Sequence, residues 1–281
     1  MIIKTYKNAN DFLNETQNFL EQNEAANNVI LGNCLRLRNE KIKNQYPPYF
    51  ASVQMNDNIT LAAMFTPPFP ITLYSDKSIT ENQIELLIQD LIDKNLDVPG
   101  VMAPLELAKL FGLTWSKLKG SNIIDGMNMR VYELVKVKHP QNSQGSFRIA
   151  QNEDLKTIST WIYNLEKDEG SDITYEKAYE IAKNKIDNGE LYIWEDKVPV
   201  SMACTARPTN NGIVVNMVYT PTELRGRGYA SACVASLSQH LLNLDYKFCS
   251  LFTDLSNPTS NNIYMKIGYR AVCDCKGYSF K

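Results

Sequence analysis

The spacing of apolar and polar positions changes several times along the chain, and each change predicts an element. Alternating or continuous apolar runs of four to eight residues predict strands, whereas apolar residues three and four apart predict helices. From residue 147 to the end, the pattern predicts this order: a strand at 147–150, a helix from about Asn152, a helix at 175–186, strands at 191–194, 198–207 and 213–220, a long helix with an apolar stripe from Ala230 to Leu244, a strand at 248–252, a short helix at about 260–266 and a final hairpin at 269–280. That order is typical of a mixed sheet with helices on both faces.

The first half offers a fainter version of the same order. The pattern predicts helical structure at 12–36, strands at 50–53, 61–65 and 71–74, a helix at 84–92, a strand at 98–102, a helix at 105–113 and a last strand at 129–137. The polar stretch 138–146, KHPQNSQGS, separates the halves and predicts a linker. We therefore expect an α/β chain of two similar domains, 1–137 and 147–281.

Composition narrows the classes of partner. Among 281 residues, 29 Lys and Arg stand against 31 Asp and Glu, so the net charge of −2 supplies no field for binding nucleic acid. The sequence shows neither a secretory signal nor 18 consecutive apolar residues, so we expect a cytoplasmic protein without membrane association. Cys273 and Cys275 have one residue between them and no second Cys or His pair nearby, so we expect no metal site.

The most informative segment is 218–230, VYTPTELRGRGYA. A predicted strand enters a turn with Gly226 and Gly228, and the turn opens a long helix. Backbone N–H groups at such a helix start have no intrahelical acceptor and lie at the positive end of the helix dipole, which favours an anion such as phosphate. Arg225 and Arg227 add positive charge. Alternatively, this is an ordinary strand–helix turn with solvated arginines. The spacing fits neither of the common glycine-rich motifs for nucleoside triphosphates and dinucleotides.

Two signatures together carry a family resemblance. Arg225-x-x-Gly228-x-Ala230 resembles the pyrophosphate loop of the GNAT acetyltransferase superfamily, whose pattern is Gln/Arg-x-x-Gly-x-Gly/Ala. Farther along, an Asn at 257, a helix with Tyr264, and Gly268 followed by an aromatic residue resemble the second signature of the superfamily. The resemblance covers 147–281. It implies two GNAT-like domains, each a mixed, mostly antiparallel sheet with helices on both faces.

The resemblance also implies the ligand and the residues that contact it. The ligand is acetyl-coenzyme A, the acyl donor, with its diphosphate on the backbone of about 226–231 and its pantetheine arm between the strands before and after the long helix. The implied coenzyme-contacting residues are Met217, Val218, Tyr219, Arg225, Gly226, Arg227, Gly228, Tyr229, Ala230, Ser231, Asn257 and Asn261. Tyr264 matches the catalytic Tyr that protonates or hydrogen-bonds the departing thiolate. Without the resemblance, Tyr264 is equally a packed helix residue, and Asn257 a turn or cap residue.

The first half departs from both signatures. At the corresponding helix start it reads YSDKSITE, residues 74–81, with no glycine and added acid. We therefore expect residues 1–137 to form a degenerate GNAT-like domain that shapes the acceptor side or stabilises the fold.

These observations favour an N-acetyltransferase that transfers acetyl from acetyl-coenzyme A to a primary amine of a small molecule or to a peptide amino terminus by direct attack. A non-catalytic sensor of acyl-coenzyme A is the alternative, and a tRNA-dependent aminoacyl transferase is a third. Glu166, Asp168, Glu169 and Asp172, between the first two helices of the second half, either bind a cationic acceptor or form a solvated turn. The pattern identifies neither the general base nor the oligomeric state.

Overall fold

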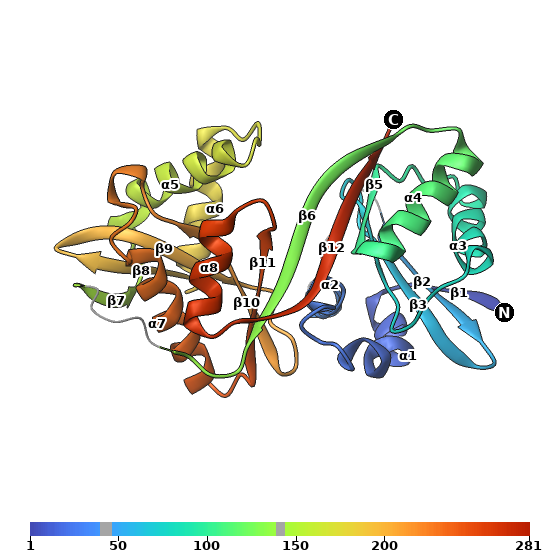
Figure 1. The fold of residues 1–281 in the computed structure, drawn as a ribbon, viewed down its shortest axis with the longest axis horizontal. Coiled ribbons are helices and arrows are strands. Elements are labelled where there is room, and N and C mark those ends of the chain that lie inside the picture. The colour runs from blue at the N-terminus through green and yellow to red at the C-terminus, as the bar shows by residue number, and fades with distance from the viewer. Residues whose placement is uncertain (40–46, 139–143) are drawn as a thin grey trace. The chain divides into compact units, whose positions relative to one another are not determined.

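The computed structural model describes residues 1–39, 47–138 and 144–281, and its elements are labelled in Figure 1. The chain forms two compact units. The first consists of residues 1–131, 252–257 and 271–281, and the second of 132–251 and 258–270. The grouping differs from the predicted domains because segment 252–257 and the last eleven residues pack with the first unit. Much of the predicted linker, 139–143, lies outside the described residues.

The first unit is built from these elements: β1 (Ile2–Tyr6), α1 (Ala9–Glu21), α2 (Asn28–Asn39), β2 (Tyr49–Met55), β3 (Asn58–Phe65), β4 (Ile71–Tyr74), α3 (Glu81–Asp93), β5 (Gly100–Pro104), α4 (Leu105–Lys119), most of β6 (Ile123–Leu134) and most of β12 (Arg270–Phe280). Its strands follow the order β1-β2-β3-β4-β5-β12-β6. Apolar side chains of α3 and α4 pack on one face of this sheet, and those of α1 and α2 pack on the other.

The predicted single helical segment at 12–36 is two helices. Asn27 explains the break, because its side-chain amide donates to the Leu20 carbonyl at 2.8 Å and so satisfies an acceptor at the end of α1. Strand β1 has no counterpart in the prediction. The strand predicted at 71–74 is β4 with the same bounds, and the other predicted elements of the first half are present with shifted ends.

The second unit is built from β7 (Ser146–Ile149), α5 (Leu155–Asp168), α6 (Tyr175–Asp187), β8 (Leu191–Asp196), β9 (Val198–Ala206), β10 (Gly212–Tyr219), α7 (Tyr229–Asn243), the start of β11 (Phe248–Asp254) and α8 (Pro258–Ile267). Short 3₁₀ turns at Asn152–Asp154 and Thr222–Leu224 precede α5 and α7. Strands β7 to β10 are antiparallel, and β10 is parallel to β11. Residues of α7 and α8 pack on one face, and those of α5 and α6 on the other. The mixed α/β fold predicted from the sequence is confirmed.

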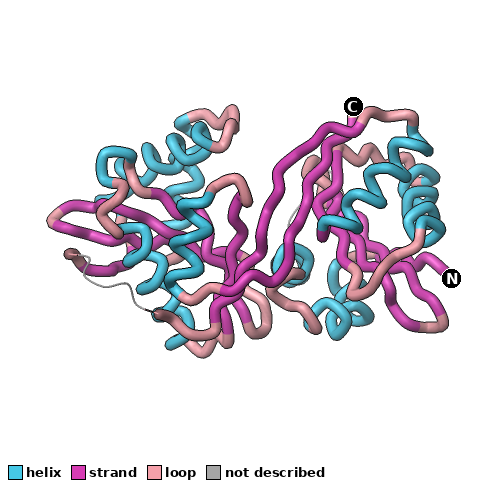
Figure 2. The backbone as a smooth tube through the Cα atoms, viewed as in Figure 1, coloured by secondary structure: helices cyan, strands magenta, loops and turns pink. Residues whose placement is uncertain are grey.

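The predicted final hairpin is wrong. Residues Arg270–Phe280 form one uninterrupted strand, β12, which runs beside β6 in Figure 2. This strand pairs antiparallel with β5, from Cys275 opposite Pro104 to Ser279 opposite Gly100. Gly277 lies within this strand rather than in a turn. The Met102 side chain approaches it closely, because a Cβ at Gly277 would lie 3.1 Å from that side chain.

Candidate functional site

Strand β10 loses its regular pairing just before the predicted phosphate loop. Its pairing with β11 runs only from Gly212 opposite Phe248 to Val214 opposite Ser250. On its other edge, Asn216 lies opposite Cys204 and Tyr219 opposite Met202, so β10 carries one extra residue. Such a bulge takes backbone groups out of the ladder. Met217, within it, has a φ of +49°, which is unusual for a residue with a side chain.

Two buried polar atoms lie where β10 and β11 stop pairing. The Asn216 Oδ1 and the Ser250 Oγ have no hydrogen-bond partner among the described residues, although Ser250 is almost fully buried. Ser250 lies opposite Val214, two residues before Asn216, so the side chains share one face of the sheet. Buried polar atoms are nearly always paired, so these two fit a position where the polar groups of a ligand complete the hydrogen bonding.

The loop after β10 leads into a helix whose start is open to a ligand. Gly226 and Gly228 have φ values of +80° and +82°, a conformation that glycine adopts without strain. Gly228 is the N-cap of α7, and no side chain caps this end. The first intrahelical bond runs from the Ala232 N–H to the Gly228 carbonyl at 3.0 Å. The N–H groups of residues 229–231 precede it and therefore have no acceptor within the helix.

The corresponding helix start in the first unit is closed. Helix α3 begins after Thr80, and the Gln83 side chain folds back so that its Oε1 accepts from the Thr80 N–H and hydroxyl, both at 3.0 Å. Glu81 in the first turn pairs with Lys117 at 3.0 Å. A side-chain cap and an acidic first turn leave this helix start poorly suited to a phosphate.

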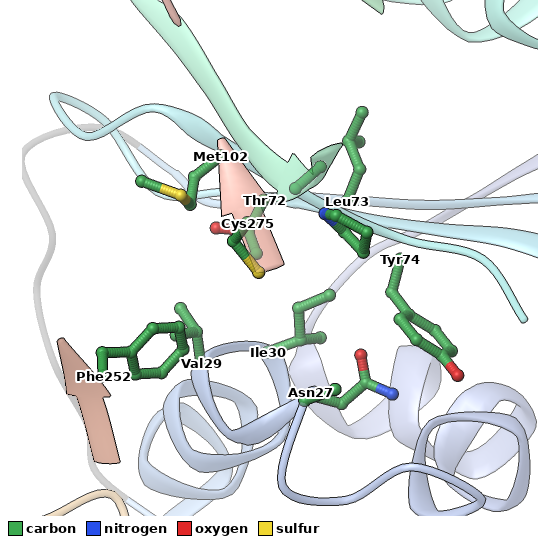
Figure 3. Close-up of a pocket in the computed structure, with 12 residues that line it drawn as sticks. Asn27, Val29, Ile30, Thr72, Leu73, Tyr74, Met102, Phe252 and Cys275 are labelled. Carbon is green, nitrogen blue, oxygen red and sulfur yellow. The ribbon is translucent and has the colours of Figure 1, made fainter. Parts of the chain in front are cut away.

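The first unit also has a hollow at the end of β4 and β5, shown in Figure 3. Its empty volume, including space open to solvent, is about 330 Å³. The lining is mostly apolar and includes Ile30, Leu73, Met102 and Phe252, with the Cys275 thiol and the Tyr74 ring at its sides. No Lys, Arg or His contributes to the lining, so the hollow lacks charged groups for binding a diphosphate.

Several predicted coenzyme-contacting side chains have structural contacts of their own. The Tyr229 hydroxyl donates to Asp196 at 2.7 Å, and Tyr219 packs against Trp161 with ring centroids 6.2 Å apart. Asn261 is buried, and its Oδ1 accepts from the Tyr132 hydroxyl at 3.0 Å. For Tyr229 and Tyr219, only backbone groups are therefore suited to hold a coenzyme. Val218, Ala230 and Ser231 are partly exposed.

The two arginines of the loop flank Gly226 in the sequence and have different partners. Arg225 donates from Nε to the Thr220 carbonyl at 3.0 Å and pairs through Nη2 with Asp168 at 3.3 Å. Arg227 donates to the Glu223 carbonyl at 3.4 Å. Sequence reasoning did not foresee the Arg225–Asp168 pair. Asp168 is the last residue of α5, and Glu166 lies in the same helix rather than in a loop.

Tyr264 lies on α8 within the aromatic cluster of the second unit. Its ring is 5.9 Å from that of Tyr269 and 6.4 Å from that of Tyr132, by centroid distance. Its hydroxyl makes no hydrogen bond to any described residue. Burial raises the pKa of Tyr264 to about 12, and the negative charge of Glu169 adds to this shift. The phenol therefore stays protonated at neutral pH, as a proton donor requires.

Asn257 directly precedes α8. Its backbone N–H donates to the Asp254 carbonyl at 3.1 Å, so it belongs to a turn after β11. Its predicted contact with the coenzyme stays a prediction, as do the contacts of Met217 and Val218. The described residues form no cluster of His, Cys, Asp and Glu that could hold a metal ion. Among the described residues, no helix is long and apolar enough to span a membrane.

Comparisons with known proteins find one family model and several solved structures that this chain resembles. A model of the FR47-like protein family matches residues 196–276, which include the bulge, the loop and α8. An acetyltransferase of the GNAT family from Colwellia psychrerythraea has a similar structure, with a TM-score of 0.61, 13% identity and full coverage of both chains. A GCN5-related N-acetyltransferase from Sphaerobacter thermophilus gives a TM-score of 0.61 at 14% identity, covering 100% of this chain and 95% of that one.

A tandem GNAT protein from the clavulanic acid biosynthesis pathway is also similar, with a TM-score of 0.58 at 11% identity and coverage of 99% and 98%. No curated protein matches the sequence. At these identities the likeness concerns the fold. The protein has the fold of the GNAT superfamily, and its full-length similarity to a tandem GNAT protein supports a tandem architecture.

Proposed function

We propose that this protein is an N-acetyltransferase that uses acetyl-coenzyme A and acetylates a primary amine of a small molecule or a peptide amino terminus. The observation that carries the proposal is the uncapped start of α7 behind Gly226 and Gly228, directly after a bulged strand that has separated from β11. An anion site beside a partly unpaired strand suits a ligand with a diphosphate at one end and an amide-containing arm at the other.

In this proposal, each part of the ligand has a matching group on the chain. The backbone N–H groups of 226–231 bind the diphosphate, and Arg225 and Arg227 add positive charge. Backbone groups of Met217 and Val218, released from the ladder by the bulge, hydrogen-bond the pantetheine arm. One of these N–H groups polarises the thioester carbonyl. A donor in such a position typically lowers the activation free energy by about 3 kcal/mol. Asn257 and Asn261 remain proposed contacts of the coenzyme, although the Asn261 Oδ1 already accepts a hydrogen bond from the Tyr132 hydroxyl.

The reaction requires no covalent link to the protein. The neutral amine attacks the thioester carbonyl carbon, the new C–N bond replaces the C–S bond, and the nitrogen loses a proton to solvent water, which balances the proton that the thiolate takes up. The Tyr264 hydroxyl, which its raised pKa keeps protonated at neutral pH, donates a hydrogen bond or its proton to the departing thiolate, and solvent restores any proton that it gives up. Holding the amine and the thioester in contact supplies much of the remaining acceleration.

The first unit does not bind a second coenzyme in this proposal. The Gln83 side chain closes the start of α3, and Glu81 adds negative charge. We propose that this unit is a degenerate GNAT-like domain that shapes the acceptor side or stabilises the fold.

The proposal is tested by assaying release of the coenzyme A thiol from acetyl-coenzyme A across a broad panel of amines and peptide amino termini. Acceptor-dependent release that falls in the Tyr264→Phe variant supports the enzyme. Tight coenzyme binding with no release for any acceptor would instead support the acyl-coenzyme A sensor. Salt-dependent binding of tRNA together with absent coenzyme binding would favour the aminoacyl transferase.

A further inference from the structure

The chain carries a pair of thiols that the proposed acetyl transfer does not use. Cys273 and Cys275 lie two residues apart on β12, so their side chains extend from the same face of the strand. Their sulfur atoms are 3.9 Å apart, within hydrogen-bond distance for thiols. Asp274, between them, points to the other face and binds Arg130 of β6 through two hydrogen bonds of 2.6 and 2.8 Å.

Cys273 differs from the other five cysteines of the chain, which are all described. Cys34, Cys204, Cys233, Cys249 and Cys275 are buried, whereas Cys273 is partly exposed. Burial raises the pKa of the thiols of Cys34, Cys204 and Cys249 to about 12, and that of Cys233 further.

The two members of the pair shift in opposite directions. The hydrogen bond from Cys275 lowers the pKa of Cys273 below its usual value, and the same bond together with burial raises the pKa of Cys275. The thiolate is the nucleophilic form of cysteine. Cys273, which is partly exposed and whose pKa is lowered, is thus the more reactive of the two thiols, and buried Cys275 lies next to it.

Reversible oxidation at cysteine follows this arrangement in proteins: an accessible thiolate reacts first, and a neighbouring thiol then resolves the product. The geometry points to a reversible oxidation site at Cys273 and Cys275, in which hydrogen peroxide converts the two thiols into an intrastrand disulfide. The Cys273 sulfur attacks one peroxide oxygen, the O–O bond breaks, and water leaves after proton transfer. The resulting sulfenic acid is attacked by the Cys275 sulfur, which forms the S–S bond and releases a second water.

The pairing of β12 with β5 leaves Cys273 free to move toward Cys275. Residues two apart in a regular strand have Cα atoms about 6.7 Å apart, near the upper end of the range that disulfides span. Closure therefore shortens the strand between the two cysteines. The ladder with β5 begins only at Cys275, opposite Pro104, which has no N–H to donate, so Cys273 and Asp274 can move without breaking a bond to β5. The strain of closure makes the disulfide easy to reduce, so the oxidation is reversible.

Trypsin isolates the site, because cleavage after Arg270 and after Lys276 yields a peptide, residues 271–276, with these two cysteines and no other. The intact protein is treated with hydrogen peroxide, the peroxide is removed, free thiols are blocked with N-ethylmaleimide in denaturant so that buried thiols also react, and the mass of the tryptic peptide is measured. We expect a mass about 2 Da below the reduced, unblocked peptide, and restored blocking of both thiols after dithiothreitol. The peptide that contains Cys249 stays fully blocked.

Two variants separate the roles. In Cys275→Ser, the sulfenic acid at Cys273 persists and is captured by dimedone. In Cys273→Ser, Cys275 gives neither disulfide nor dimedone adduct. The inference is overturned if wild-type Cys273 and Cys275 both remain blocked by the maleimide at peroxide concentrations that oxidise free cysteine. It is also overturned if Cys273 proceeds to sulfinic acid while Cys275 stays free, or if the disulfide links two chains.

Discussion

The guanidinium of Arg225 pairs with the carboxylate of Asp168 at 3.3 Å, so a residue predicted to bind phosphate is held by the end of helix α5. Both side chains are more than half exposed. The second contact of Arg225, from Nε to the Thr220 carbonyl, fixes the side chain next to the loop without help from Asp168. In the proposed function, Asp168 and the diphosphate therefore compete for one end of the same guanidinium.

Replacing Asp168 with Asn should strengthen coenzyme binding slightly. The variant loses an exposed ion pair, which is typically worth less than about 1 kcal/mol, so we expect the Kd for coenzyme A to fall by up to about fivefold. Titration calorimetry measures this. Asp172→Asn is the matched control, because Asp172 is fully exposed and pairs with Lys167 instead. Weaker binding by Asp168→Asn would mean that Arg225 needs Asp168 to stay in place.

Gly226→Ala should weaken coenzyme binding more than its effect on stability explains. A Cβ at Gly226 meets no atom within 4 Å, so the cost to folding is the strain of a positive φ, about 1–2 kcal/mol. Gly120→Ala is a close control, because Gly120 has a φ of +68° and equally open space but ends α4 in the first unit. We expect similar losses of melting temperature from both variants and a raised Kd for coenzyme A only from Gly226→Ala.

Tyr264→Phe should lower kcat by about 100-fold while leaving the Kd for coenzyme A nearly unchanged, since the ring and its packing remain. The pKa of about 12 also predicts that Tyr264 does not titrate between pH 6 and 9, so the variant should lower the pH–rate profile without changing its shape. Tyr269→Phe is the control, because it removes a buried hydroxyl bonded to Ser238 at 2.9 Å in the same cluster. Equal losses of kcat in both variants would assign Tyr264 to packing.

Asp154 provides a prediction of stability against pH. Burial by itself would raise the pKa of Asp154, but two hydrogen bonds from Arg148, at 2.8 and 2.9 Å, and one from the Gln151 N–H outweigh it and lower the pKa. A lowered pKa stabilises the folded state above the unfolded value, near 4, and this contribution is lost as the pH falls through the folded pKa.

Asp154→Asn should therefore cost about 1–3 kcal/mol at pH 7 and reduce the decline of the melting temperature below pH 4. Thermal unfolding at several pH values measures both effects. Asp187→Asn, which removes an exposed pair with Lys183, should leave the melting curve almost unchanged. An acid decline identical to that of the wild type would show that other carboxylates control it.

Local patterns predicted most helices and strands of this chain, because an element with one buried face has apolar residues at a regular spacing in the sequence. The strand predicted at 191–194 is β8, and the middle of the predicted stripe, Cys233, Val234, Leu237 and Leu241, is buried on α7. Ala230 is partly exposed, and Leu244 follows the end of the helix and is exposed. The spacing of apolar residues does not show which distant strands pair with each other. The union of β12 with β5 joins residues more than 170 positions apart in the sequence, and the same apolar alternation fits a hairpin equally well.

The sequence likewise predicted only part of the candidate site. The glycines of the loop are visible in the sequence because their positive φ values require that residue. The bulge at Met217 is not, because nothing in an apolar run indicates where an extra residue enters the ladder. Side-chain partners such as Asp196 for Tyr229 also come from tertiary packing.

We propose that one helix start, that of α7, binds the diphosphate of the coenzyme. A crystal structure of the protein with coenzyme A tests it most directly. We predict one coenzyme per chain, with diphosphate oxygens within hydrogen-bond distance of the backbone N–H groups of residues 226–231. A diphosphate bound anywhere else, including the start of α3, with no anion at the α7 loop would contradict the account.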